Sequence, residues 1–185
     1  MDQRTSERPI IVIISGLPGT GKSGVAQRLA HDTSRLLIEK DPVKEIIANV
    51  AVDQRFELTK EFAHVAGAAS MQLVYDLLDR VTVARIPAIV EAAFWPELAA
   101  NDLAPYLSRT DLRQVHCWTR PNVLLERYAQ RERHPVHHDD DAINGLRQRI
   151  EEGRDGRIPL DAPCFSVETT DGFHPEWDEV LAFAR

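Results

Sequence analysis

The chain has 185 residues, of which 43% are hydrophobic and 28% are charged, with a formal net charge of −7 at pH 7. This length and composition predict a single globular domain over residues 1–185, built around one buried core. The acidic balance argues against a nucleic-acid partner, because a polynucleotide backbone is itself negatively charged.

The cysteines and the opening residues indicate the compartment. Cys117 and Cys164 lie outside any C-x-x-C pair, which argues against a disulfide framework or a zinc finger and fits a reducing environment. The opening "MDQRTSERP" is polar, and the apolar run at 10–14 is too short to span a bilayer. We therefore expect a cytoplasmic protein with no membrane partner and a flexible segment at residues 1–8.

The predicted elements alternate between strands and helices. An Ile- and Val-rich run predicts a strand at 10–14 that is buried on both faces, and apolar residues with helix spacing follow at 22–32. The polar stretch at 131–141 predicts a mobile loop. The alternation indicates an α/β fold with a central parallel sheet. The remaining predicted elements are, in chain order, a strand at 35–41, helices at 42–50 and 58–84, a strand at 87–94, a helix at 96–107, a strand at 113–119, a helix at 121–133, a helix ending near 152, a strand at 164–169 and a C-terminal helix.

The segment "GLPGTGKS" at 16–23 joins the first strand to the first helix and matches the phosphate-binding motif G-x-x-x-x-G-K-[ST]. Its glycines let the backbone turn with amide groups inward, and the helix start adds unpaired N–H groups and a partial positive charge. Lys22 can reach β- and γ-phosphate oxygens, and the Ser23 hydroxyl can ligate Mg²⁺. The motif predicts a triphosphate-binding loop formed by consecutive residues: Gly16, Leu17, Pro18, Gly19, Thr20, Gly21, Lys22, Ser23 and Gly24.

The sequence lacks the signature motifs of two other classes of P-loop protein. A GTPase carries a D-x-x-G switch and an N-K-x-D guanine-binding motif, and neither string occurs in the chain. A AAA+ or helicase motor usually has a paired Asp-Glu at the end of an apolar strand, whereas the third predicted strand ends in the single acid Glu91.

The chain resembles the small-molecule P-loop kinases of the shikimate kinase, chloramphenicol phosphotransferase and polynucleotide kinase group, which have an AAA-type ATP-binding domain. The resemblance covers roughly residues 10–171 and depends on four segments in order. They are "GLPGTGKS", "LLIEKDPVKEII" with Asp41 closing the second strand, "AIVEAAF" with Glu91 closing the third, and "LLERYAQRERH" after the fourth. It implies a five-stranded parallel sheet of order 2-3-1-4-5, flanked by helices, with a lid segment at 131–141 that closes over ATP.

The resemblance also implies roles for two acids. Asp41 would accept the proton of the acceptor hydroxyl or orient it, although Asp41-Pro42 also fits a helix N-cap followed by proline in the first turn, and the two roles are compatible. Glu91 stands where the group usually has Asp. It could hold Mg²⁺ through water or contact the acceptor, or it could be a solvated carboxylate at a strand end.

Arginines of the predicted lid are the remaining catalytic candidates. Arg127 and Arg131 are one helical turn apart and share a face of the predicted helix. In the resembled kinases such arginines neutralise charge on the transferring phosphoryl group, and Arg133 is a further candidate. The alternative is an ordinary charged helix face.

Other residues near these segments have two interpretations. His134, His137, His138 and Asp139 could supply zinc ligands, although a flexible polar lid explains this composition more simply. Phe94 and Trp95 could form a wall of the acceptor pocket or belong to the core. The same two interpretations hold for a group of residues in the segment 42–75, where we expect the acceptor pocket: Phe56, Phe62, His64, Met71 and Tyr75.

The leading hypothesis is an ATP- and Mg²⁺-dependent phosphotransferase that acts on a hydroxyl of a small molecule. A nucleoside or nucleotide kinase is an alternative enzyme, and a nucleotide-binding regulatory switch or ATPase is an alternative of another class. A polynucleotide kinase is disfavoured because the chain lacks a basic stretch that could follow a strand. No heptad pattern indicates an oligomeric state.

Overall fold

The computed structural model describes residues 8–185, and within this range it leaves the side chains of 139–141 undescribed. The predicted flexible segment therefore lies outside the described residues, except for Arg8. Five strands form one parallel sheet in the order β2-β3-β1-β4-β5, which confirms the predicted topology. The strands are β1 (Ile10–Ser15), β2 (Leu36–Glu39), β3 (Ala88–Glu91), β4 (Asp111–Trp118) and β5 (Cys164–Glu168).

Helices connect the strands and cover both faces of the sheet. Two single-turn 3₁₀ helices, η1 (Ala104–Tyr106) and η2 (Pro135–His137), add to the α-helices. Within residues 8–185 no helix is long and apolar enough to cross a membrane. The α-helices are α1 (Lys22–Thr33), α2 (Lys40–Asp53), α3 (Lys60–Ala84), α4 (Pro96–Leu103), α5 (Pro121–Gln130), α6 (Asp139–Glu151) and α7 (Trp177–Ala184).

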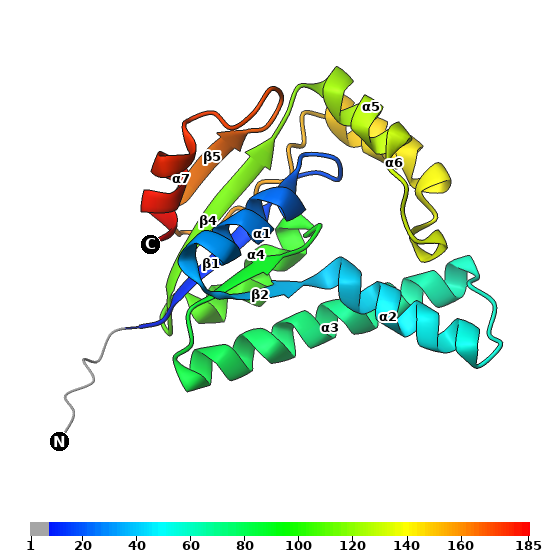
Figure 1. Ribbon diagram of the computed structural model, residues 1–185, viewed down its shortest axis with the longest axis horizontal. Helices are drawn as coiled ribbons and strands as arrows, with labels where there is room; N and C mark the ends of the chain where they lie inside the picture. The colour runs from blue at the N-terminus through cyan, green and yellow to red at the C-terminus, as the bar shows by residue number, and fades with distance from the viewer. Residues whose placement is uncertain (1–7) are drawn as a thin grey trace.

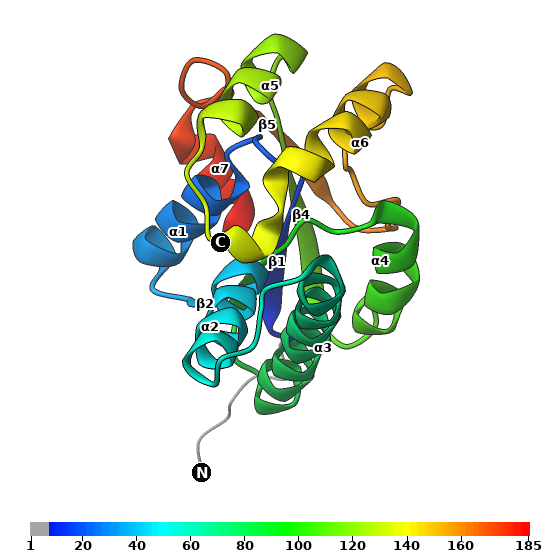
Figure 2. The ribbon, with the colours of Figure 1, turned by 90° about the vertical axis from the view of Figure 1, so that its right-hand side faces the viewer.

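The central strand β1 is buried on both faces, as its sequence predicts. Successive side chains of a strand point to opposite faces, so β1 contributes to two hydrophobic clusters. Val12 and Ile14 pack in the cluster that contains residues of α1 and α7. Ile11 and Ile13 pack in the cluster that contains residues of α3 and α4. Figure 2 shows these two helix pairs on opposite sides of the sheet.

The parallel strands place their carboxyl ends at one edge of the sheet, where open α/β sheets bind ligands. The loop after β1 lies at this edge. Helices α5 and α6 extend beyond it, and the chain between them leads back toward α2 (Figure 1). The candidate functional residues that the sequence predicts therefore lie together at one end of the molecule.

Two predicted boundaries are wrong in ways that affect the site. Strand β2 ends at Glu39 and α2 begins at Lys40, so Asp41 lies in the first turn of a helix and does not close the strand. The fixed φ of Pro42 suits a first helical turn, which allows α2 to begin directly after the strand. Helix α5 ends at Gln130, and Arg131 has an extended backbone.

Candidate active site

The loop between β1 and α1 has the backbone of a phosphate-binding nest. Gly16, Gly19 and Gly21 all have positive φ. Gly16 has a φ of 136°, and a Cβ atom there would lie 2.1 Å from the carbonyl oxygen of Cys117, so only glycine fits. Gly21 is the N-cap of α1, and no side chain caps the helix. The first amide groups of α1 therefore remain available to an anion.

Lys22 is buried at the start of α1. Its Nζ atom donates a hydrogen bond to the carbonyl oxygen of Leu17 at 3.1 Å and lies 3.9 Å from Oε1 of Glu91. Glu91, the last residue of β3, is only 4% exposed, and its burial raises the pKa of its carboxyl group. The ammonium group of Lys22 and the carboxyl group of Glu91 therefore lie near each other, beside the loop and partly shielded from water.

A depression of about 570 Å³ in front of the loop brings most of the predicted site residues together. Three residues of the loop are instead buried and do not line the depression: Gly16, Leu17 and Thr20. The hydroxyl of Thr20 donates a hydrogen bond to the carbonyl oxygen of Leu17 at 2.8 Å. The predicted residues that line the depression are Pro18, Gly19, Gly21, Lys22, Ser23, Gly24, Asp41, Glu91, Arg127, Arg131 and Arg133.

Asp41 enters this depression from the first turn of α2. The N-cap of α2 is Glu39, so the interpretation of Asp41 as a helix cap is wrong. Its carboxylate forms an ion pair with Arg133 and lies 3.9 Å from Nζ of Lys40. Burial disfavours the charged form, but the neighbouring positive charges outweigh burial, and the pKa of Asp41 is below its ordinary value. Asp41 is therefore an ionised acceptor at neutral pH.

Arg127 and Arg131 do not share a helical face, because α5 ends between them. The guanidinium group of Arg127 donates to the carbonyl oxygens of Thr169 at 2.7 Å and Thr170 at 2.9 Å. The hydroxyl of Thr169 donates in turn to the carbonyl oxygen of Thr20 at 2.9 Å, which connects Arg127 to the phosphate-binding loop. The guanidinium group of Arg131 lies 3.9 Å from the centroid of the Tyr128 ring.

The polar stretch between α5 and α6 is anchored on α2, a feature that sequence reasoning missed. Besides the ion pair between Arg133 and Asp41, Nε2 of His137 lies 2.9 Å from Oε1 of Glu45. Lys44 donates a hydrogen bond to the carbonyl oxygen of Val136 at 2.9 Å. The pairs are about ninety positions apart in sequence, and no periodicity or motif relates them.

The zinc interpretation of the polar stretch finds no support. His134 and His138 form hydrogen bonds to two different partners, Oδ1 of Asn49 and the carbonyl oxygen of Leu58. Among the residues whose side chains are described, no three His, Cys, Asp or Glu residues are grouped to hold a metal ion. The side chain of Asp139 lies outside that set. These histidines therefore join the lid to α2 and to the start of α3.

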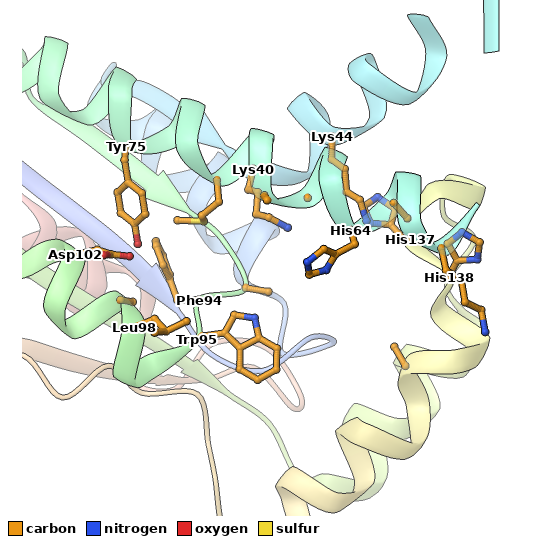
Figure 3. Close-up of a pocket in the computed structure, with 18 residues that line it drawn as sticks. Lys40, Lys44, His64, Tyr75, Phe94, Trp95, Leu98, Asp102, His137 and His138 are labelled. Atoms are coloured by element: carbon orange, nitrogen blue, oxygen red, sulfur yellow. The ribbon is translucent and has the colours of Figure 1, made fainter. Parts of the chain in front are cut away.

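A second cavity, of about 710 Å³, adjoins the first and lies between α2, α3, the start of α4 and η2. Lys40, Ala93 and His137 line both cavities, so the two share part of their walls. Figure 3 shows Tyr75 and Asp102 at one end and His137 and His138 at the other.

Most of the predicted pocket residues line this cavity, and two do not. Phe94, Trp95, His64, Met71 and Tyr75 line the cavity. Phe62 instead packs against a small buried cluster, and Phe56 is 66% exposed outside the lining.

Comparisons with known proteins identify the family and the fold. The family model described as AAA domain matches residues 11–153. A protein of Chloroflexus aurantiacus, whose assignment as a kinase is provisional, is 25% identical, with a TM-score of 0.82 over 97% of this chain and 98% of that chain. No protein with a curated description is similar in sequence.

Two more distant solved structures share the fold. A gluconokinase from Sinorhizobium meliloti is 17% identical, with a TM-score of 0.52 over 98% of this chain and 91% of that chain. A shikimate kinase from Bacteroides thetaiotaomicron is 14% identical, with a TM-score of 0.51 over 95% of this chain and 94% of that chain. The chain belongs to the AAA domain family and has the fold of the small-molecule P-loop kinases.

Proposed function

We propose that the protein is an ATP-dependent phosphotransferase that moves the γ-phosphoryl group to a hydroxyl of a small molecule. One observation carries this proposal: the phosphate-binding loop and Asp41 line one depression, and a second cavity adjoins this depression. Phosphoryl transfer needs a donor and an acceptor aligned at one place, with charge neutralised between them.

The nucleotide site is formed by the loop and the start of α1. The inward amide groups bind phosphate oxygens, and Lys22 exchanges its hydrogen bond to Leu17 for the β- and γ-phosphates. Mg²⁺ would supply positive charge that offsets the charge of the phosphate oxygens. The hydroxyl of Ser23 is an oxygen ligand of the kind that Mg²⁺ prefers, and Glu91 is suited to hold the ion through water.

Asp41 aligns the acceptor. Its lowered pKa keeps it ionised, so it can accept a hydrogen bond from the acceptor hydroxyl and then its proton. Position matters more than basicity here, because phosphoryl transfer is catalysed mainly by alignment and charge neutralisation. Arg131 and Arg133, which line the same depression, supply positive charge to the transferring group.

Closure of the lid keeps water away from the phosphoryl group. The segment that contains η2 already contacts α2 and α3, so it is placed to limit the access of water to the acceptor hydroxyl. A nucleotide-dependent regulatory switch would not need the second cavity beside Asp41. A nucleoside kinase would use it, and the experiment below includes nucleosides for this reason.

The test is Mg²⁺-dependent ADP release measured with a panel of sugars, sugar acids, nucleosides and ring-bearing alcohols. In the wild type we expect one acceptor class to raise turnover well above the rate with ATP alone. Lys22→Ala should lose turnover in all conditions, and Asp41→Asn should lose only the stimulation by acceptor while ATP still binds. Asp53→Asn, at the other end of α2 and exposed, is the matched control and should behave as wild type. A wild type that binds ATP and ignores every acceptor would contradict the proposal.

A further inference from the structure

The second cavity has large apolar side chains exposed on its wall. Trp95 is 57% exposed and Leu98 is 64% exposed, and both line the cavity. Exposed apolar side chains are ordinary when scattered, but a group of them on a concave surface indicates a surface that a ligand covers. Phe94 continues the same wall toward the core.

Helix α3 leaves space opposite this wall. The α3 residues that line the cavity include the larger His64 and Met71, but three of them are small: Ala63, Gly67 and Ala68. A Cβ atom at Gly67 would meet only the Cε atom of Lys44, at 3.8 Å, which is an ordinary contact. The fold itself therefore tolerates a side chain at this position, and the space is available to a ligand.

The two ends of the cavity differ in chemistry. At the end shared with the phosphate-binding depression lie Lys40 and His137. At the other end Tyr75 and Asp102 point toward each other (Figure 3). Burial, together with the charge and hydrogen bond of Asp102, raises the pKa of the Tyr75 hydroxyl, which therefore stays protonated as a donor.

We infer that the acceptor is a hydroxylated compound whose body is an apolar ring system, rather than a polyol. This inference rests on the proposed function: the hydroxyl reaches Asp41 and the ring covers Trp95 and Leu98. A polyol would bury several hydroxyls against an apolar wall, and each buried hydroxyl without a partner is unfavourable. The cavity volume of about 710 Å³ is large enough for a ring compound of drug size, since pockets for such molecules measure roughly 300–1,000 Å³.

The test compares two acceptors that differ only in the ring. Phenylethylene glycol and ethylene glycol carry the same diol, and gluconate and adenosine represent the other acceptor classes. We expect kcat/KM for the phenyl compound to exceed that for ethylene glycol by about 10- to 100-fold, because its ring leaves water on binding. Equal kcat/KM values for the two glycols, or faster turnover of gluconate or adenosine than of the phenyl compound, would overturn the inference.

Two tryptophan variants test whether the preference for the phenyl compound depends on Trp95. Trp95→Ala should reduce the preference for the phenyl compound about tenfold, through a higher KM, with ATP affinity unchanged. Trp118→Ala is the control, because Trp118 is also partly exposed but lines a different cavity. An equal loss of preference in both variants would overturn the role of Trp95.

A binding measurement separates this inference from the proposed function. Phenylethylene glycol should change the tryptophan fluorescence of the wild type and of Trp118→Phe, but not that of Trp95→Phe. If it binds in this Trp95-dependent way while no acceptor stimulates ADP release, the ligand class stands and phosphoryl transfer is wrong. If another acceptor stimulates ADP release and the phenyl compound neither binds nor reacts, phosphoryl transfer stands and the ligand class is wrong.

Discussion

The guanidinium group of Arg133 pairs with the carboxylate of Asp41, so the lid is joined directly to the residue proposed to align the acceptor. The acceptor hydroxyl and Arg133 both need an oxygen of the same carboxylate. If Asp41 aligns the acceptor as proposed, binding of the acceptor has to displace or share this contact. Acceptor binding and the position of the Arg133 charge would then be coupled through one residue.

This pairing predicts a shift in pH dependence. Arg133 is the largest of the influences that lower the pKa of Asp41, and burial opposes it. In Arg133→Met the pKa of Asp41 should rise, so the acidic limb of the kcat/KM profile should move to higher pH. Arg120→Met, which removes an exposed arginine outside the depression, should leave the limb in place. An unchanged limb in Arg133→Met would show that another group governs it.

Glu91 gives a second prediction, on stability. Its folded-state pKa is raised by burial, so the fold favours the protonated form, and stability is lost as pH rises from the unfolded pKa through the folded pKa. In Glu91→Gln the side chain cannot ionise, so this variant does not lose stability in this way as pH rises. The difference in unfolding free energy, variant minus wild type, should therefore increase between about pH 4 and pH 7. Urea unfolding at the two pH values measures it, and a constant or decreasing difference would contradict the assignment.

Arg127 is predicted to position the phosphate-binding loop rather than to contact ATP. It reaches the loop through Thr169, whose hydroxyl bonds to the carbonyl oxygen of Thr20. Arg127→Met should cost roughly 1–3 kcal/mol of stability, because buried carbonyl oxygens lose a charged donor.

A double-mutant cycle tests this connection. In Thr169→Val the hydroxyl is lost and the shape is kept, so its effect on ATP affinity should overlap with that of Arg127→Met. The two changes should then combine to less than their sum. Full additivity would indicate that Arg127 acts on the nucleotide separately.

Local chemistry explains what could be predicted from the sequence. The nest at Gly16 to Gly21 is specified by consecutive residues, and alternation of apolar runs predicts the parallel sheet. The order of the strands came from the resemblance, because a buried strand does not specify which neighbour it pairs with. The end of β2 was misplaced because no turn residue separates Glu39 from Lys40.

The contacts of the lid could not be predicted, since they join distant segments. Asp41 and Arg133 carry ordinary charges in polar stretches, and only the folded chain brings them together. The contact of Gly156 could not be predicted either, because no sequence motif surrounds this residue. In the structure it packs against the phosphate-binding loop: a Cβ atom there would lie 2.7 Å from the carbonyl carbon of Gly16 and 2.8 Å from the amide nitrogen of Leu17.

Gly156 provides the last prediction. It lies after α6 and packs against the phosphate-binding loop. Gly156→Ala should separate the two backbones, weaken ATP binding and destabilise the protein. Gly153→Ala is a matched control, because Gly153 has a similar positive φ of 71° against 82° but nothing within 4 Å of its added Cβ. Both variants carry the backbone strain of alanine at positive φ, about 1 kcal/mol. Only Gly156→Ala adds the collision, so it alone should lower ATP affinity in a titration, and equal affinities in the two variants would show that the loop tolerates the displacement.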